Sequence, residues 1–217
     1  MFPNILEWID RGLPTYVKGH AIPFSHDVDN SGTVNDRSRL REYIEFIDEL
    51  HQPVLDIGGE NWINEQIETQ MKFRSYRTFE TNFNDVVEAP RKDFGTIFCF
   101  EVVEHVMNPL NFMRDILRLT APGGVVYLST PRISIISIYH TEMHFTEYKE
   151  SKLDTLFEYA GFAVEKKELF CNIPLWWAVT GFRPLFRKIF HRSIVYELRK
   201  SRNSANVPES GRPPPPA

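Results

Sequence analysis

The chain has 217 residues, 42% of them apolar, and a formal net charge of −4. This length suits one α/β domain with a sizeable core, and the acidic balance argues against general nucleic-acid binding. The longest apolar stretch, 173–182, is too short to span a bilayer, and no charged and apolar leader opens the sequence. With two cysteines and no metal-ligand spacing, we expect a cytoplasmic protein without disulfides or a metal site.

The first 51 residues are expected to form a helical cap. A short helix is expected over 3–11 and a longer amphipathic helix over 38–51, where apolar residues recur at helical spacing: Leu40, Tyr43, Ile44, Ile47 and Leu50. Residues 27–38 resemble the opening of a calcium-binding EF-hand loop. The last position is Ser38, where calcium requires a bidentate carboxylate, so we interpret this segment as a polar loop that caps the next helix.

A short apolar run over 54–57 ends in Gly58 and Gly59 and is followed by a helical pattern over 61–71. The shortness of the run and the glycine stop favour a β-strand. A strand that ends in glycines and leads into a helix offers free backbone N–H groups and a close approach to a ligand. In a parallel sheet this is typical of a nucleotide or nucleoside site, although a tight turn capped by Asp56 would explain the same residues.

The next two strands are expected over 75–80 and 96–100. The second of these is almost wholly apolar, which favours a strand buried on both faces. Between Glu80 and Asp93 there are too few residues for another full helix and strand. We therefore expect a shortened sheet edge, with 82–87 forming a strand stub or an ordered loop.

The following segment begins with a helix signal. Asn108 is expected to cap a helix whose first residue is Pro109, where the missing N–H costs nothing. The helix is expected to end at the turn 121–124, before a strand over 125–130. A long connection over 132–148 then holds two histidines.

The last part of the chain continues the alternation of helices and strands. A helix over 151–160 is expected to end at Gly161, and strands are expected over 162–169 and 194–198. Residues 201–217 are expected to be a disordered, proline-rich tail.

Four sequence blocks occur in a fixed order between residues 52 and 170: LDIGGEN, GTIFCFEVVEHVMNPLNFM, APGGVVYLSTP and HFTEYKESKLDTLFEYAGF. In this order they resemble the motifs of class I S-adenosylmethionine-dependent methyltransferases of the compact bacterial type. The resemblance implies a Rossmann-like α/β domain over 52–200, with a seven-stranded, mostly parallel sheet, a final antiparallel strand and a shortened stretch between the second and fourth strands. It also implies that S-adenosylmethionine lies across the carboxyl ends of the first half of the sheet.

The resemblance assigns cofactor-binding positions along this edge. The glycine turn would approach the amino-acid portion of the cofactor, and an acid at the end of the second strand would accept hydrogen bonds from the ribose hydroxyls. An amide and an acid shortly after it are candidates for the adenine edge. The positions implied are Asp56, Ile57, Gly58, Gly59, Glu60, Glu80, Asn84, Asp85, Phe100, Glu101, Val102 and His105.

The glycine turn departs from the family's pattern, in which glycine occupies every second position. This chain has Gly58, Glu60 and Trp62 there. Glu60 near a helix N-terminus suits the ammonium group of the cofactor. Trp62 would narrow the pocket.

The expected reaction is methyl transfer, in which the cofactor supplies the reactive group and the protein aligns the acceptor and excludes water. A hydroxyl acceptor also needs a base to take its proton. His144 is the first candidate for this base and His140 the second, although either could be a hydrogen-bonded loop residue. We expect an acceptor that is a small molecule, a saccharide or a lipid-linked compound, methylated at oxygen.

Other functions remain open. The missing glycines and the absence of a clear base would also suit a catalytically inactive, methyltransferase-like protein that binds a partner. Residues 173–190 mix aromatic and basic side chains as an insertion on the substrate side, and 173–192 could instead contact a membrane surface or pack on the sheet with a solvated basic face. We expect no nucleic-acid partner, and a monomer or a homodimer.

Overall fold

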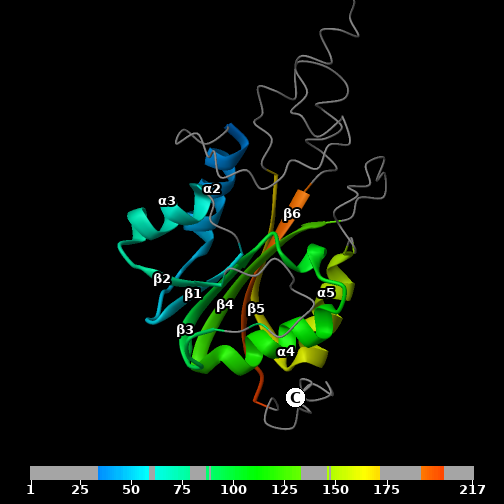
Figure 1. The fold of residues 1–217 in the computed structure, drawn as a ribbon. Coiled ribbons are helices and arrows are strands. Elements are labelled where there is room, and N and C mark those ends of the chain that lie inside the picture. Colours follow the sequence, from blue (N-terminus) through cyan, green and yellow to red (C-terminus); the bar gives the residue numbers. More distant parts are fainter. Residues whose placement is uncertain are drawn as a thin grey trace, which may run out of the picture.

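The computed structural model describes residues 34–58, 62–78, 87, 89–132, 146, 148–171 and 192–202. In these residues a six-stranded sheet, with one strand fewer than the resemblance implies, lies between two layers of helices (Figure 1). The strand order is β2-β1-β3-β4-β6-β5. The strands are β1 (Val54–Ile57), β2 (Ser75–Thr78), β3 (Phe94–Phe100), β4 (Thr120–Arg132), β5 (Phe162–Phe170) and β6 (Arg192–Lys200).

The sheet is mostly parallel. Strands β2, β1, β3 and β4 pair in parallel, whereas β6 is antiparallel to both of its neighbours, β4 and β5. This confirms the expected α/β fold with a final antiparallel strand. The expected shortening of the sheet edge falls on residues 79–86, which lie outside the described part of the chain.

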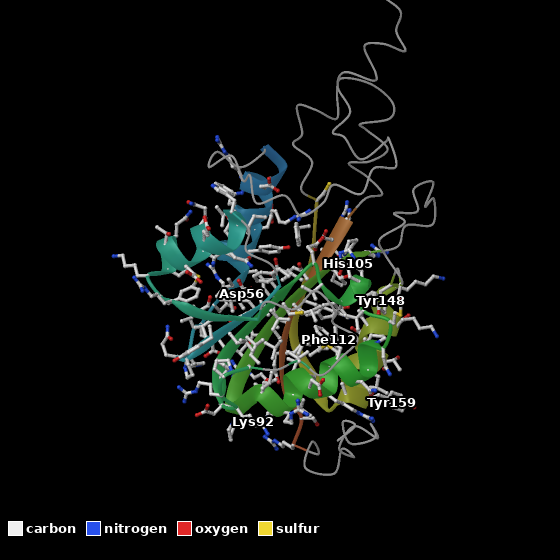
Figure 2. All side chains as sticks on the ribbon, in the orientation of Figure 1. Asp56, Lys92, His105, Phe112, Tyr148 and Tyr159 are labelled. Carbon is white, nitrogen blue, oxygen red and sulfur yellow. The ribbon has the colours of Figure 1, made fainter. Side chains whose placement is uncertain are left out.

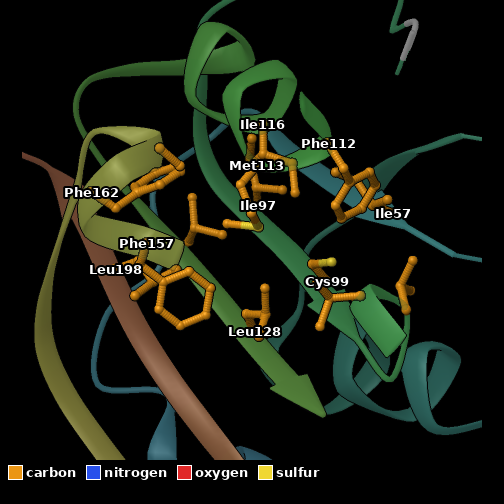
Figure 3. Close-up of a cluster of buried hydrophobic side chains, with 14 of the residues drawn as sticks. Ile57, Ile97, Cys99, Phe112, Met113, Ile116, Leu128, Phe157, Phe162 and Leu198 are labelled. Atoms are coloured by element: carbon orange, nitrogen blue, oxygen red, sulfur yellow. The ribbon is translucent and has the colours of Figure 1, made fainter. Parts of the chain in front are cut away.

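Helices cover both faces of the sheet. Helices α2 (Val34–Phe46) and α3 (Trp62–Met71) lie on one face, and α4 (Pro109–Leu119) and α5 (Glu150–Ala160) on the other (Figure 1). Each face has its own apolar core, because successive side chains of a strand point to opposite sides. In β1, Leu55 and Ile57 join the core under α4 and α5, shown in Figure 3, while Val54 joins the core under α2 and α3.

Local signals set several helix ends as expected. The Asn108 side chain accepts a hydrogen bond from the Asn111 backbone N–H at 3.2 Å, and Pro109 is the first residue of α4. Gly161 ends α5 with a φ of 98°, a left-handed conformation that glycine adopts readily.

The turn expected at 121–124 is wrong. Strand β4 begins at Thr120, directly after α4, and Phe94 pairs with Thr120 before a register irregularity restores the regular pairing of Thr96 with Val125. The Pro-Gly-Gly residues are therefore part of an irregular strand start rather than a separate turn. Pairing with β3, which local sequence does not reveal, decides this.

The cap helix also differs from its expected bounds of 38–51, because α2 spans Val34–Phe46. Helix α2 ends where side chains from the sheet donate hydrogen bonds to its backbone carbonyls and to those that follow it. Lys166 Nζ donates to the Phe46 carbonyl at 3.0 Å, and the Tyr127 hydroxyl donates to the Glu49 carbonyl at 3.0 Å.

Residues 47–53, here called the strap, fasten α2 to the amino ends of β3 and β4. The His51 backbone N–H donates to Thr96 Oγ1 at 2.8 Å, and the Gly95 N–H donates to the Pro53 carbonyl at 2.9 Å. Helix α2 therefore shares a core with the sheet, with Tyr43 and Phe46 each only 1% exposed.

Several expectations lie outside the described residues: the helix over 3–11, most of the loop 27–38, the segment 173–190 and the tail from 203 onward. Among the helices that the structure describes, none is long and apolar enough to cross a membrane.

Gly95→Ala tests the docking of the strap. An added Cβ would lie 2.7 Å from both the Cβ and the backbone oxygen of His51, so the strap must shift. We expect the free energy of unfolding to fall by about 2 to 3 kcal/mol in urea denaturation. The control is Gly123→Ala, which has a φ of 76° but nothing within 4 Å, and should lose only roughly 1 kcal/mol. Equal losses in the two variants would contradict the close approach of the strap.

Candidate functional site

The sheet has a topological switch point between β1 and β3. These strands are parallel neighbours, yet the chain leaves β1 toward α3 on one face and leaves β3 toward α4 on the other (Figure 1). In open α/β sheets, ligands bind in the crevice that such a divergence opens outside the carboxyl ends of the strands. The candidate site is therefore the edge formed by the ends of β1 and β3.

The two strand ends meet closely at this edge. Gly58, directly after β1, is buried and has a φ of 148°, and a Cβ added to it would lie 3.5 Å from Val102 Cγ2. Glycine adopts this conformation without strain. The structure thus brings together Gly58 and Val102, two of the positions that the resemblance assigns to the cofactor edge. Ile57, also expected here, turns its side chain into the core, so only its backbone can face a ligand (Figure 3).

Asp56 lies beneath α3 (Figure 2). Asp56 is 2% exposed, and its Oδ2 accepts a hydrogen bond from Asn64 Nδ2 at 2.7 Å, while Oδ1 has no hydrogen-bond partner among the described residues. Burial raises the pKa of Asp56 to about 7, against the opposing effects of Arg77 and of the Asn64 hydrogen bond. Asp56 therefore ties the first turn of α3 to the end of β1, which places the glycine turn between them.

Glu101 is held at the end of β3. Its φ of 56° is unusual for a residue other than glycine and stores strain of a kind that occurs at functional sites. The Glu101 N–H donates to the Ser129 carbonyl at 2.9 Å, and Ser129 Oγ donates to Glu101 Oε1 at 2.9 Å. The guanidinium of Arg39 lies 4.0 Å from the other carboxylate oxygen. The carboxylate of Glu101 is thus oriented before any ligand arrives.

Glu104 is the more deeply buried acid of this region. It is 1% exposed, Oε2 accepts a hydrogen bond from Thr130 Oγ1 at 3.0 Å, and its backbone carbonyl accepts one from the Thr146 N–H at 3.3 Å. Burial, and then the negative charge of Glu101, raise the pKa of Glu104 well above its usual range. These contacts join the ends of β3 and β4 to the chain before α5, which fits a supporting role.

His105 follows Glu104 in the short 3-10 helix η2 (Val103–His105), beyond the end of β3 (Figure 2). The side chain is half-buried, and the backbone N–H donates to the Val102 carbonyl at 2.9 Å. The turn therefore keeps His105 at the same edge as Gly58.

Helix α2 contributes residues that the sequence did not assign to the site. The Tyr43 ring stacks on Phe100, with ring centroids 4.2 Å apart, and the Tyr43 hydroxyl lies 2.6 Å from Ser129 Oγ. Arg39 stands one helical turn before Tyr43 and faces Glu101. The only sequence signal was this four-residue spacing, which indicates a shared helix face but not what the face contacts.

The remaining predicted site residues lie outside the described residues and stay predictions. They are Gly59, Glu60, Glu80, Asn84, Asp85, His140 and His144. Over the part of the chain that the structure does describe, no group of three or more His, Cys, Asp or Glu side chains could hold a metal ion.

Comparisons with known proteins agree with this geometry. A family model described as a methyltransferase domain matches residues 34–167. A curated relative of Mycolicibacterium smegmatis, named "Probable S-adenosylmethionine-dependent methyltransferase", is 31% identical over 96 residues, which are 42% of this chain and 37% of the relative. The matched region thus spans little more than a third of that relative's length.

Two solved structures share the fold. One, from a complex with the Haloferax volcanii Trm112 methyltransferase activator, has a TM-score of 0.58 and 13% identity, over 78% of this chain and 91% of its own. The other, a SAM-dependent methyltransferase from Archaeoglobus fulgidus, has a TM-score of 0.55 and 17% identity, over 76% of this chain and 95% of its own.

Asp56→Asn tests the burial of the carboxylate beneath α3. Because the pKa of Asp56 is raised in the folded protein, that state keeps a proton that the unfolded chain loses, and stability falls as the pH rises from about 4 to about 7. The neutral side chain of Asp56→Asn does not titrate, so the variant does not lose this stability. The unfolding free energy of the variant minus that of the wild type should therefore increase by about 3 to 4 kcal/mol from pH 4 to pH 8.

The control for this comparison is Asp93→Asn. Asp93 is exposed and paired with Arg91, which lowers its pKa, so this variant should lose rather than gain relative stability as the pH rises. Urea denaturation of all three proteins at both pH values decides the matter. A pH-independent difference between the wild type and Asp56→Asn would contradict the raised pKa.

Proposed function

The chain belongs to the methyltransferase-domain family, and on that premise we propose that it transfers a methyl group from S-adenosylmethionine to a small-molecule, saccharide or lipid-linked acceptor, at oxygen. The observation that carries the proposal is the topological switch point, where Gly58 meets Val102 inside the region that matches the family. The curated relative and the Archaeoglobus fulgidus structure are both named as S-adenosylmethionine-dependent methyltransferases, which supports the choice of cofactor.

The residues at this edge fit the cofactor. Gly58 carries no side chain at the point of closest approach, so its backbone can face the bound molecule. Glu101 keeps 19% of its side chain exposed and presents a fixed carboxylate, which accepts hydrogen bonds from hydroxyl or ammonium groups. Phe100, half-buried at the end of β3, directly precedes Glu101, and its ring stacks on Tyr43.

When bound, S-adenosylmethionine supplies the electrophilic methyl group. The protein must then hold the acceptor oxygen in line with that methyl group and keep water away. A hydroxyl acceptor loses its proton during the transfer, and His144, with His140 as the second candidate, is proposed to take it.

The class of acceptor follows from charge and composition. The net charge of −4 disfavours a nucleic-acid substrate. The aromatic and basic residues over 173–190 suit a sugar ring, a phosphate or a lipid-linked group beside the site.

The methylated atom of the acceptor can be identified with S-adenosylmethionine that carries carbon-13 in its methyl group. The protein is incubated with this cofactor and a candidate acceptor, and the carbon-13 chemical shift of the product distinguishes a methyl ether from an N-methyl group. We expect a methyl ether, and an N-methyl product would overturn the choice of oxygen.

Calorimetric titration with S-adenosylhomocysteine tests the cofactor site. We expect micromolar binding by the wild type, and at least roughly tenfold weaker binding by Gly58→Ala, because a side chain at this φ costs roughly 1 to 3 kcal/mol and displaces the turn. Gly123→Ala is the matched control, since Gly123 also has a positive φ but lies near the start of β4, away from the candidate site at the carboxyl ends of the strands.

The outcomes separate the alternatives. Affinity lost in Gly58→Ala and kept in Gly123→Ala supports the proposed site. No binding by the wild type would overturn the proposed activity, and the catalytically inactive, partner-binding protein would then be the better explanation.

A further inference from the structure

We propose that Tyr43 of α2 is a positioning residue of the cofactor site, and that it acts through Ser129 on the carboxylate of Glu101. This inference rests on the proposed function, because it assumes that S-adenosylmethionine binds at the sheet edge beside Glu101. It extends the site to a helix that precedes the first strand of the sheet.

The Tyr43 hydroxyl, the Ser129 hydroxyl and Glu101 Oε1 form a hydrogen-bond chain in which each hydroxyl donates toward Glu101. Ser129 has a single hydroxyl proton and donates it to Glu101 Oε1 at 2.9 Å. The Tyr43 hydroxyl, 2.6 Å from Ser129 Oγ, must therefore be the donor to serine. Burial and the nearby charge of Glu101 raise the pKa of Tyr43 well above its usual range, so tyrosine keeps the proton that this arrangement requires.

The tyrosine is itself immobilised. Its ring stacks on Phe100 with an interplanar angle of 11° and meets the edge of Phe170, whose centroid is 5.5 Å away. The strap, residues 47–53, fastens the far end of α2 to the sheet through His51 and Thr96. The position of the Tyr43 hydroxyl is thus set by packing, independently of any ligand.

Glu101 needs such support. A glutamate side chain has several freely rotating bonds, and at the mouth of a site it would otherwise sample many rotamers. The Ser129 carbonyl accepts a hydrogen bond from the Glu101 N–H, and the Ser129 hydroxyl donates one to Glu101 Oε1. The Arg39 guanidinium lies 4.0 Å from the other carboxylate oxygen, Oε2. Groups that must meet a ligand act best when neighbouring contacts lock their orientation in advance. Tyr43 fixes the orientation of the Ser129 hydroxyl through its hydrogen bond.

Tyr127 provides a matched control. It is a buried tyrosine on the same face of the sheet, and its hydroxyl also makes a hydrogen bond, to the Glu49 carbonyl at 3.0 Å. That hydroxyl reaches the strap, at the opposite end of the sheet from Glu101. Tyr127→Phe therefore removes the two hydrogen bonds between this hydroxyl and the Glu49 backbone, as donor to the carbonyl and acceptor from the N–H, without touching the site.

The test measures the Kd of S-adenosylhomocysteine by calorimetry on the full chain, with urea denaturation alongside. Tyr43→Phe keeps the ring and removes one oxygen, and we expect it to weaken binding about five- to tenfold. Ser129→Ala should weaken binding at least as much, and adding Tyr43→Phe to it should cause less than about a twofold further change. Tyr127→Phe should lower stability while leaving the Kd unchanged.

A double-mutant cycle with Glu101→Ala distinguishes a positioning role of Tyr43 from a general structural role. Without the carboxylate there is nothing to position, so Tyr43→Phe should change the Kd less than about twofold in that background. If Tyr43→Phe fails to fold, Ser129→Ala breaks the same chain from β4 and takes its place in the cycle.

The possible results are distinct. Wild-type binding that Tyr43→Phe and Ser129→Ala leave intact would overturn this inference alone. Equal weakening by Tyr43→Phe and Tyr127→Phe would also overturn it, because general destabilisation would then be the cause. Absence of binding by the wild type would overturn the proposed function, and this inference with it.

Discussion

The parallel pairing of β1 with β3 is the constraint on which the rest of the structure depends. Because the chain leaves these strands toward opposite faces, their carboxyl ends form the kind of switch point at which open α/β sheets bind ligands. Gly58 and Val102 meet there, and the distorted backbone of Glu101 turns the chain at the same edge. The positive φ values of Gly58 and Glu101 thus fall where a ligand is expected.

Two adjacent residues of β4 organise the carboxylates of this edge. Ser129 and Thr130 point to opposite faces of the sheet, as neighbours on a strand must. Ser129 holds Glu101 on the face of α2 and α3, and Thr130 holds Glu104 on the other. The more exposed acid is free to meet a ligand, while the buried one, whose pKa is raised, secures the frame.

Helix α2 has a larger role than that of a cap. Its apolar side packs into the same core as β1 and β3, and the strap over 47–53 fixes its end to the sheet. The family match begins at residue 34, the first residue of this helix. Helix α2, with the contact of Tyr43 and Ser129, therefore lies within the region that matches the family model.

Local sequence determined the elements and their order. The apolar run of β1, the Asn108 cap, Pro109 at the first turn of α4 and Gly161 after α5 act within a few residues, so their signals can be read directly. The order of the sequence blocks likewise pointed to the family and to the edge formed by Gly58 and Val102.

Tertiary structure decided what those local signals could not. The early start of β4 at Thr120 depends on pairing with Phe94, and the early end of α2 depends on contacts with Lys166 and Tyr127. The link between Tyr43 and Ser129 joins residues that are 86 positions apart. Periodicity showed that Tyr43 would be buried, but only the folded sheet brings a serine to its hydroxyl, because hydrogen bonds between distant segments leave no pattern in the sequence of either one.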